Sequence, residues 1–214
     1  EHVEEDFKGK ITFTEEKLID YDAIIATGSD NTARYFEYYF KNKPNIIRKS
    51  RNSVAVLTGN ETEDDFIKLS DDIFQYFGLG CRSVSKIYVP KDYNFDAFFT
   101  GMYAKKEHIN NAKYANNYDY NKAVYLMSEF ELLENGFLMI KEDASYSSPI
   151  ATIFYEYYDT ESDLKIKLDH DKEKIQCIVA NGFIGNEVAF GQTQHPKLTD
   201  FADGINTLEF LNQL

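Results

Sequence analysis

Cys81 is the residue whose type and position point most clearly to chemistry. It lies in the segment YFGLGCRSVSKIYVP (residues 76–90), in the break between a helix-like stretch and a strand-like one. A buried structural cysteine, by contrast, usually lies inside an element. A glycine-flexible loop can bring a thiolate to a substrate carbonyl. Arg82 and Lys86 favour the thiolate, whereas the negative end of the preceding helix opposes it. The local sequence leaves two interpretations open, a nucleophile and a structural thiol.

The other residues with chemical potential give weaker signals. The second cysteine, Cys177, lies inside a strand-like stretch and is interpreted as core packing. No C-x-x-C pair, H-E-x-x-H motif or G-x-S-x-G motif is present, so neither a metal site nor serine hydrolase chemistry is predicted. The acidic runs at 63–65 and 71–72 are interpreted as solvent-exposed helix faces. Three isolated histidines are interpreted as solvated or hydrogen-bonded (His108, His170 and His195).

Length and charge exclude several classes of protein. The chain has 214 residues, 43% of them hydrophobic, enough to bury a core as one large domain or as one domain with part of another. Its 23 basic and 36 acidic residues give a net charge of −13, which disfavours nucleic acid as a partner. No apolar run approaches the roughly 18 residues of a membrane-spanning helix, and the N-terminus lacks the features of a signal peptide. We therefore expect a cytoplasmic protein without a membrane span.

The segment YDAIIATGSDNTARYFEYYF (21–40) has the pattern of a strand, a tight turn and a helix. Ser29 is a good N-cap, and Asp30 suits the positive end of the helix that follows. Backbone N–H groups at such a helix start can bind a phosphate. Most strand-to-helix turns only connect their elements, so this turn alone does not establish a phosphate site.

The remaining elements continue an alternation of strands and helices. Thr62 is expected to cap a helix over 63–77. Helices are also expected around 95–103 and near 121–129, and the end of the chain (205–214) is amphipathic. Strand candidates have short apolar runs bounded by turn residues (53–57, 84–90, two within 137–160, and one within 174–182). This alternation predicts an α/β protein.

Five segments occur in an order that resembles the aldehyde dehydrogenase superfamily over nearly the whole chain. They are IIATGSDNTAR (24–34), NSVAVLTGNET (52–62), FGLGCRSVSKIYVP (77–90), KEDASYSSPIATIFYEYYDTESD (141–163) and VAFGQTQHPKLTDF (188–201). In this resemblance Cys81 matches the catalytic cysteine. Thr27, Gly28 and Ser29 match the turn beside the nicotinamide dinucleotide. Pro149 matches the proline of E-E-x-F-G-P-V, and Phe190 and Gly191 match the late F-G-G loop.

The resemblance implies a fold, a domain organisation and a cofactor. The fold is an aldehyde dehydrogenase-like catalytic domain, three-layer α/β/α with a mostly parallel sheet. Residues 1–50 are expected to be a remnant of the dinucleotide-binding, Rossmann-like domain, and residues 51–214 the cysteine-containing catalytic domain. The cofactor portion that precedes Gly28 in the superfamily, with its oxyanion-binding asparagine, is missing, so we expect a fragment. The parent protein would use NADP or NAD, and the fragment is expected to bind neither tightly.

Within the superfamily, the sequence is most similar to the acyl-CoA or acyl-protein reductases of bacterial bioluminescence (LuxC type). The similarity is clearest in the segments GCRSVSKIYVP and YANNYDYNKAVYLM (114–127). Aldehyde oxidisers carry E-L-G-G-K-S, whose glutamate activates water, where this chain has RKSRNS (48–53). Without that base, hydrolysis of an acyl-cysteine should be slow, and a thiol such as CoA becomes the expected acyl partner. The ribose-contacting glutamate falls near Ser145, so its role is not carried over.

The resemblance thus implies NAD(P)H-dependent reduction of an acyl-CoA or acyl-protein thioester to an aldehyde through an acyl-cysteine on Cys81. Two alternatives stay open. The first is another CoA-acylating or phosphate-linked semialdehyde dehydrogenase of the same superfamily, and the second is a non-catalytic module that keeps the fold. The superfamily also implies a homo-oligomer as one option. Acyl-chain length and the choice between NADH and NADPH stay open as well.

Overall fold

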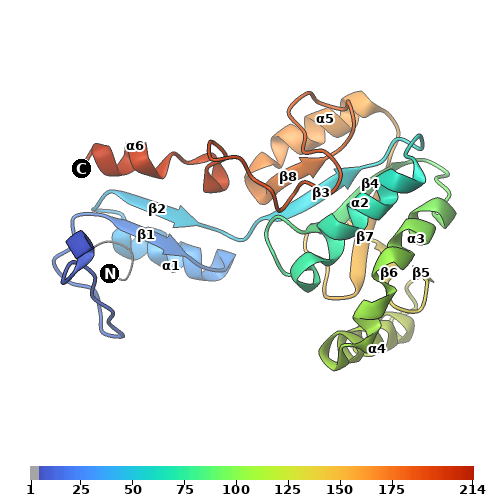
Figure 1. The fold of residues 1–214 in the computed structure, drawn as a ribbon, viewed down its shortest axis with the longest axis horizontal. Helices are drawn as coiled ribbons and strands as arrows, with labels where there is room; N and C mark the ends of the chain where they lie inside the picture. The colour runs from blue at the N-terminus through green and yellow to red at the C-terminus, as the bar shows by residue number, and fades with distance from the viewer. Residues whose placement is uncertain (1–4) are drawn as a thin grey trace. The chain divides into compact units, whose positions relative to one another are not determined.

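A computed structural model describes residues 5–214 of the chain (Figure 1). They form two compact units, a smaller one of residues up to 49 with 206–214, and a larger one of residues 50–205. The first four residues of the predicted N-terminal domain lie outside the described part. Residues 206–214, which we predicted with the catalytic domain, group with the smaller unit. None of the helices in the described residues is long and apolar enough to cross a membrane.

The larger unit is built on a six-stranded sheet, in the order β5-β6-β7-β4-β3-β8. All neighbouring strands are parallel except β5 and β6, which are antiparallel. The prediction of an α/β fold with a mostly parallel sheet is therefore confirmed. The strands are β3 (Asn52–Val56), β4 (Val84–Pro90), β5 (Leu132–Glu134), β6 (Met139–Glu142), β7 (Thr152–Tyr158) and β8 (Ile175–Val179).

Helices cover both faces of this sheet (Figure 1). On one face Ala55 and Leu57 join a core with residues of α2 (Glu63–Phe74), α3 (Asp96–Met102) and α4 (Ala112–Met127). On the other face Val54 and Val56 pack with Leu164 and Leu168 of α5 (Glu161–His170). The alternation along β3 follows from the period of two in a strand. The domain is thus a three-layer α/β/α structure.

Helix α2 begins where the sequence predicts it. Thr62 and Asp65 form a capping box, because the side-chain oxygen of each residue accepts a hydrogen bond from the other's backbone N–H. The helix lies very close to α3 at Gly101, where a β-carbon would be only 2.2 Å from the Phe66 Cβ. A larger residue at position 101 would therefore push the two helices apart.

Three helix predictions need correction. The helix expected over 63–77 ends at Phe74, because Tyr76 and Phe77 have positive φ angles. The helix expected near 121–129 begins earlier, at Ala112, because the Asn111 side chain accepts hydrogen bonds from the N–H groups of Lys113 and Tyr114. Helix α5, capped by Thr160, was not predicted. The described residues also contain short 3₁₀ turns at Glu5–Phe7, Gln75–Gly78, Tyr103–Asn110, Lys172–Lys174 and Ala202–Gly204.

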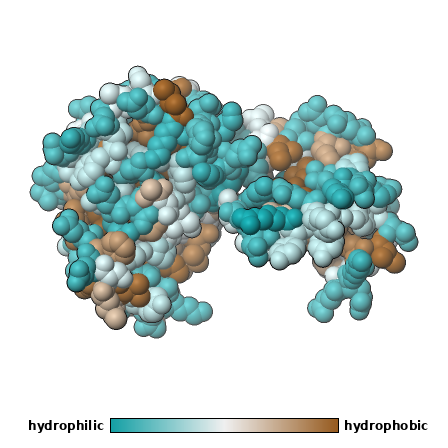
Figure 2. Space-filling model, turned by 180° about the vertical axis from the view of Figure 1, so that it is seen from behind, coloured by the Kyte–Doolittle hydropathy of each residue, from teal (hydrophilic) through white to brown (hydrophobic). Residues whose placement is uncertain are grey.

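The smaller unit contains a single strand-helix-strand unit. Strands β1 (Ile24–Thr27) and β2 (Asn45–Arg48) are parallel, α1 (Asp30–Phe40) connects them, and α6 (Thr207–Asn212) completes the unit. Among its described residues, few apolar side chains are buried (Ile24, Ala33 and Ile46), and large apolar side chains stay exposed (Phe13, Ile19, Tyr38, Tyr39 and Leu208). Figure 2 shows such hydrophobic patches on the surface. Two strands alone bury little apolar surface, so this unit has only a small core.

Candidate active site

Cys81 lies on a tight turn between α2 and β4. The N–H of Ser83 donates to the Gly80 carbonyl at 2.9 Å, which places Cys81 and Arg82 at the two central positions. Before this turn, Tyr76 and Phe77 have φ angles of 55° and 57°, which are unfavourable for residues with a side chain. The Cys81 side chain is exposed, and its N–H makes no hydrogen bond to another described residue. The sulfur is therefore accessible and has a free backbone donor beside it.

Neighbouring segments hold the turn on both sides. The Ser53 hydroxyl, which is fully buried on β3, donates to the Cys81 carbonyl at 2.9 Å. The Arg82 Nε donates a short hydrogen bond to the Thr193 carbonyl. These contacts fix the backbone around the thiol, as a positioned nucleophile requires.

Asp72 binds the backbone of the segment around Gly191. The buried carboxylate accepts hydrogen bonds from the N–H groups of Gly191, at 2.7 Å, and Thr193, at 3.0 Å. Burial raises the pKa of Asp72 above its usual value, although these hydrogen bonds oppose the change. The interpretation of residues 71–72 as an exposed helix face is therefore wrong for Asp72, which is 1% exposed. Thr193 is bound through both its N–H and its carbonyl.

An open cleft of about 890 Å³ lies beside this arrangement. Arg82 lines it, while Cys81 itself is not among the lining residues. Charges of both signs line the cleft. They come from Arg51 and from the 185–204 segment, which also contributes polar side chains (Glu187, Gln192, His195, Lys197 and Asp200). A cleft of this size next to an accessible thiol can accept an extended, polar substrate.

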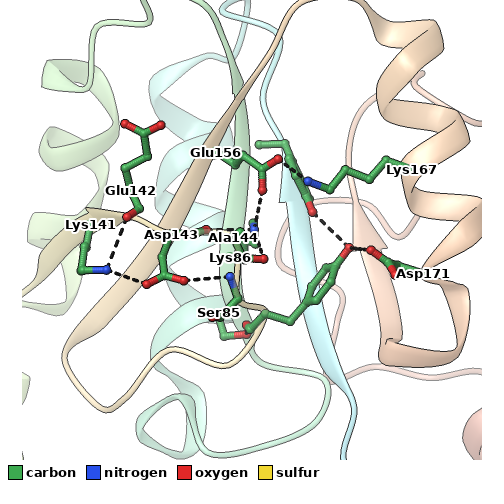
Figure 3. A network of polar contacts seen from close by, with 12 residues as sticks. Ser85, Lys86, Lys141, Glu142, Asp143, Ala144, Glu156, Lys167 and Asp171 are labelled. Atoms are coloured by element: carbon green, nitrogen blue, oxygen red, sulfur yellow. Dashed lines mark hydrogen bonds and ion pairs between the residues drawn. The ribbon is translucent and has the colours of Figure 1, made fainter.

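Strand β4 links the Cys81 turn to the segment that follows β6. Its Ser85 hydroxyl donates to the Tyr146 carbonyl at 2.7 Å. The fully buried Lys86 ammonium donates to the carbonyls of Asp143, at 3.0 Å, and Ala144, at 2.9 Å. Figure 3 shows these contacts converging on β4. One strand thus positions both the turn that carries Cys81 and the segment 143–146.

The expectation that Lys86 favours a thiolate at Cys81 does not fit its contacts. Its ammonium forms an ion pair with Glu156 at 2.8 Å, and Glu156 also binds Lys167 (Figure 3). Burial lowers the pKa of Lys86, although the hydrogen bond that Lys86 donates to Glu156 opposes the change. All its donors have protein acceptors, so Lys86 is a structural residue here.

Two acidic residues extend the same network with strongly lowered pKa values. Burial alone would raise the pKa of Asp143, but hydrogen bonds from Lys141 and from the Ser145 backbone lower it to about 2. A hydrogen bond from Lys174 lowers the pKa of Asp171 to about 2. Asp171 also accepts from Tyr146 at 2.8 Å (Figure 3). Both carboxylates are held ionised by the folded structure.

The second cysteine has the opposite environment. Cys177 lies in the middle of β8 and is 5% exposed. Burial raises the pKa of its thiol, and the nearby charge of Arg82 only partly offsets that change. The interpretation of Cys177 as a core residue fits this position. Among the described residues, no group of three or more histidine, cysteine, aspartate or glutamate side chains could hold a metal ion.

The turn of Thr27, Gly28 and Ser29 lies in the other unit, so no geometry relates it to Cys81. It connects the carboxyl end of β1 to the start of α1, and Ser29 caps the helix by accepting from the Thr32 N–H at 3.3 Å. This is the topology in which a helix start can face a nucleotide phosphate. The Gly28 N–H already donates to the Arg48 carbonyl, and Asp30 adds a negative charge to the first turn of the helix. The place of this turn, between a strand and the start of a helix, suits a phosphate. The Gly28 N–H and the Asp30 side chain do not add to phosphate binding, because the first is already paired and the second is acidic.

The other residues matched by the resemblance have packing roles. Phe190 is buried in the core of the larger unit, and Pro149 lines a small cavity of about 20 Å³ against α2. Sequence patterns did not single out Ser53 or Asp72 as site residues. The only advance signal for Asp72 was its place among the apolar residues of an amphipathic helix, where a charged residue is unusual.

Sequence comparisons do not place the chain in a family, because no model of a known protein family matches it and no curated protein matches it significantly. Solved structures do match. An indole-3-acetaldehyde dehydrogenase solved with NAD+ matches with a TM-score of 0.59 at 11% identity, over 86% of this chain and 48% of that one. Aldehyde dehydrogenase 21 from Physcomitrella patens, solved with succinate, matches with a TM-score of 0.59 at 10% identity, over 87% and 49%.

A third match is gamma-glutamyl-gamma-aminobutyraldehyde dehydrogenase from Burkholderia cenocepacia J2315. It has a TM-score of 0.54 at 15% identity, over 74% of this chain and 39% of that one. The chain therefore spans about half the length, or less, of the dehydrogenases that it matches. At these identities the similarity is one of fold, and the chain has the fold of an aldehyde dehydrogenase domain.

Proposed function

We propose that the protein to which this chain belongs reduces an acyl-CoA or acyl-protein thioester to an aldehyde, with Cys81 as the nucleophile. The observation that carries this proposal is the accessible thiol of Cys81 on an anchored turn between α2 and β4 in an aldehyde dehydrogenase fold. The LuxC-type reductases named above remain the branch to which we assign it.

The Cys81 thiolate would attack the carbonyl carbon of the thioester. A bond forms between its sulfur and that carbon, the bond from the carbon to the CoA sulfur breaks, and CoA leaves with the electron pair and takes up a proton. The Cys81 N–H, which has no partner among the described residues, would donate to the carbonyl oxygen as charge develops on it. The product of this step is an acyl-cysteine.

The segment RKSRNS supports a thiol rather than water as the other acyl partner. It places arginine, lysine, serine and asparagine where the resemblance expects a water-activating glutamate. Ser53, the last residue of this segment, instead holds the Cys81 carbonyl. Without a carboxylate base, the acyl-cysteine should persist.

A nicotinamide cofactor, when bound, would supply the hydride that converts the acyl group to an aldehyde. We propose the smaller unit as part of the cofactor-binding domain, with Thr27, Gly28 and Ser29 at the turn that faces the phosphates. The strand-helix-strand topology of that unit supports this assignment.

Mass spectrometry of the intact chain after incubation with octanoyl-CoA tests the first step. We expect one octanoyl adduct on the wild type, none on Cys81→Ala, and an unchanged adduct on Cys177→Ala, the matched control for loss of a buried thiol. Absence of an adduct on the folded wild type, or its survival in Cys81→Ala, would overturn the proposal.

A further inference from the structure

The Gln194 side chain has an amide nitrogen that is buried without a hydrogen-bond partner among the described residues. Leaving such a donor unpaired away from water costs about 1–3 kcal/mol. Two other side-chain donors next to Cys81 are paired, since the Arg82 Nε donates to the Thr193 carbonyl and the Ser83 hydroxyl donates to the Gln75 carbonyl at 3.3 Å. An unpaired donor beside a nucleophile is a candidate for binding a substrate oxygen.

The position of Gln194 brings this donor to the Cys81 turn. Its Nε2 lies 3.8 Å from the point where a β-carbon on Gly80 would be, and Gly80 directly precedes Cys81. A glycine there places no side chain between the amide and the turn. The amide therefore lies against the backbone that presents the thiol.

The backbone around Gln194 is fixed from both sides. Thr193 is bound by Asp72 through its N–H and by Arg82 through its carbonyl. The His195 N–H donates to the Gln192 carbonyl at 3.1 Å, which closes a turn with Gln194 at its third position. The backbone that carries this donor is therefore held in place, and the buried amide lies on it.

We propose that the Gln194 amide is an oxyanion donor for the reaction at Cys81. As the thiolate adds to the thioester carbonyl, the new carbon–sulfur bond pushes the π electron pair onto oxygen, and the Gln194 N–H stabilises the negative charge together with the Cys81 N–H. This inference deepens the proposed function and rests on it. The donor comes from the same unit as the nucleophile, so acylation would not need the asparagine that the resemblance expects in the cofactor domain.

The test compares two reactions of the same thiol in the intact 214-residue chain. Acylation by octanoyl-CoA passes through an oxyanion, whereas alkylation by iodoacetamide is a displacement that forms none. Both rates are measured by intact mass for the wild type, Gln194→Ala and Gln194→Met. Methionine has a similar length and no charge, but it has no N–H to donate. A thermal melt monitors the fold of each variant.

We expect acylation to slow by about 100-fold in both variants, the scale on which loss of one oxyanion donor acts, with alkylation unchanged. Equal acylation of wild type and variants would overturn the role of Gln194 and leave the proposed function intact. A parallel fall of both rates would also overturn it, because Gln194 would then only shape the turn. A wild type that is alkylated but never acylated would overturn the proposed function, and this inference with it.

Discussion

Two polar regions lie at strand β4, and they differ in whether their hydrogen-bond donors have partners. In the network around Lys86, each ammonium proton has an acceptor, and Glu156 is paired with two lysines. At the Cys81 turn, the Cys81 N–H and the Gln194 amide have no partner among the described residues. A fully paired network fixes a backbone, whereas unpaired donors keep binding capacity for a ligand. We therefore assign a structural role to the Lys86 network and the chemical role to the Cys81 turn.

Removing the centre of the paired network should have the largest effect on stability. Lys86→Met leaves Glu156 without its buried partner and the carbonyls of Asp143 and Ala144 without a donor. We expect a loss of about 3 kcal/mol in the free energy of unfolding, measured in urea, because breaking a buried ion pair leaves polar groups uncompensated.

The matched control is Lys165→Met, which removes an exposed lysine paired with Glu161 at 3.5 Å. It should change the free energy of unfolding by less than about 0.5 kcal/mol. If Lys86→Met were as stable as this control, the network would not hold segment 143–146, and the contrast drawn above would fail.

Asp72 binds the segment next to the Cys81 turn through two backbone N–H groups, and its loss should destabilise the fold less than loss of Lys86. Asp72→Asn keeps one acceptor oxygen but leaves one of the two N–H groups, of Gly191 or Thr193, facing an amide that cannot accept. We expect a loss of about 2 kcal/mol in the same urea measurement.

The neighbouring Asp71→Asn is its control, since Asp71 is half exposed and pairs with Lys105 at the surface. Acylation of Cys81 should slow in Asp72→Asn and not in Asp71→Asn, because only Asp72 fixes the backbone next to Gln194. Equal behaviour of the two variants would mean that the Gly191 segment holds itself in place.

The elements of this fold that could be predicted from sequence carry local signals. Strand β4 was found from its apolar run, and the start of α2 from its cap at Thr62, because both signals lie within a few residues. Helix α5 was missed although Thr160 caps it, since its buried residues are only Leu164 and Leu168. The turn that carries Cys81 was predicted by its glycines.

The polar contacts of the site could not be predicted in the same way. Asp72 binds groups 119 and 121 residues away, and Lys86 binds groups 57 to 70 residues away. Charged residues are usually exposed, so a sequence pattern assigns both to the surface. For Lys86, the sheet order, which places β4 next to β7, brings Glu156 within reach. For Asp72, the partners lie in the loop after β8, which only the tertiary fold brings to α2.

The smallest expected effect concerns the edge of the paired network and its dependence on pH. The pKa of Asp143 is about 2 in the folded protein and near 3.8 in the unfolded chain. A carboxylate with a lowered pKa stabilises the fold above its unfolded pKa and loses that contribution as the pH falls from about 4 to 2. Asp143→Asn should therefore cost roughly 1 kcal/mol at pH 7, because Lys141 and the Ser145 N–H lose an ionised partner.

The difference between wild type and Asp143→Asn should shrink as urea unfolding is repeated at lower pH, since a protonated aspartate resembles asparagine. Asp169→Asn, which removes an exposed partner of Lys172 at 3.6 Å, should show no such pH dependence. A difference for Asp143→Asn that stayed constant down to pH 2.5 would mean that its side chain acts through shape and neutral hydrogen bonds. The edge of the network would then resemble the Cys81 turn, where charge pairing plays no part in holding the backbone.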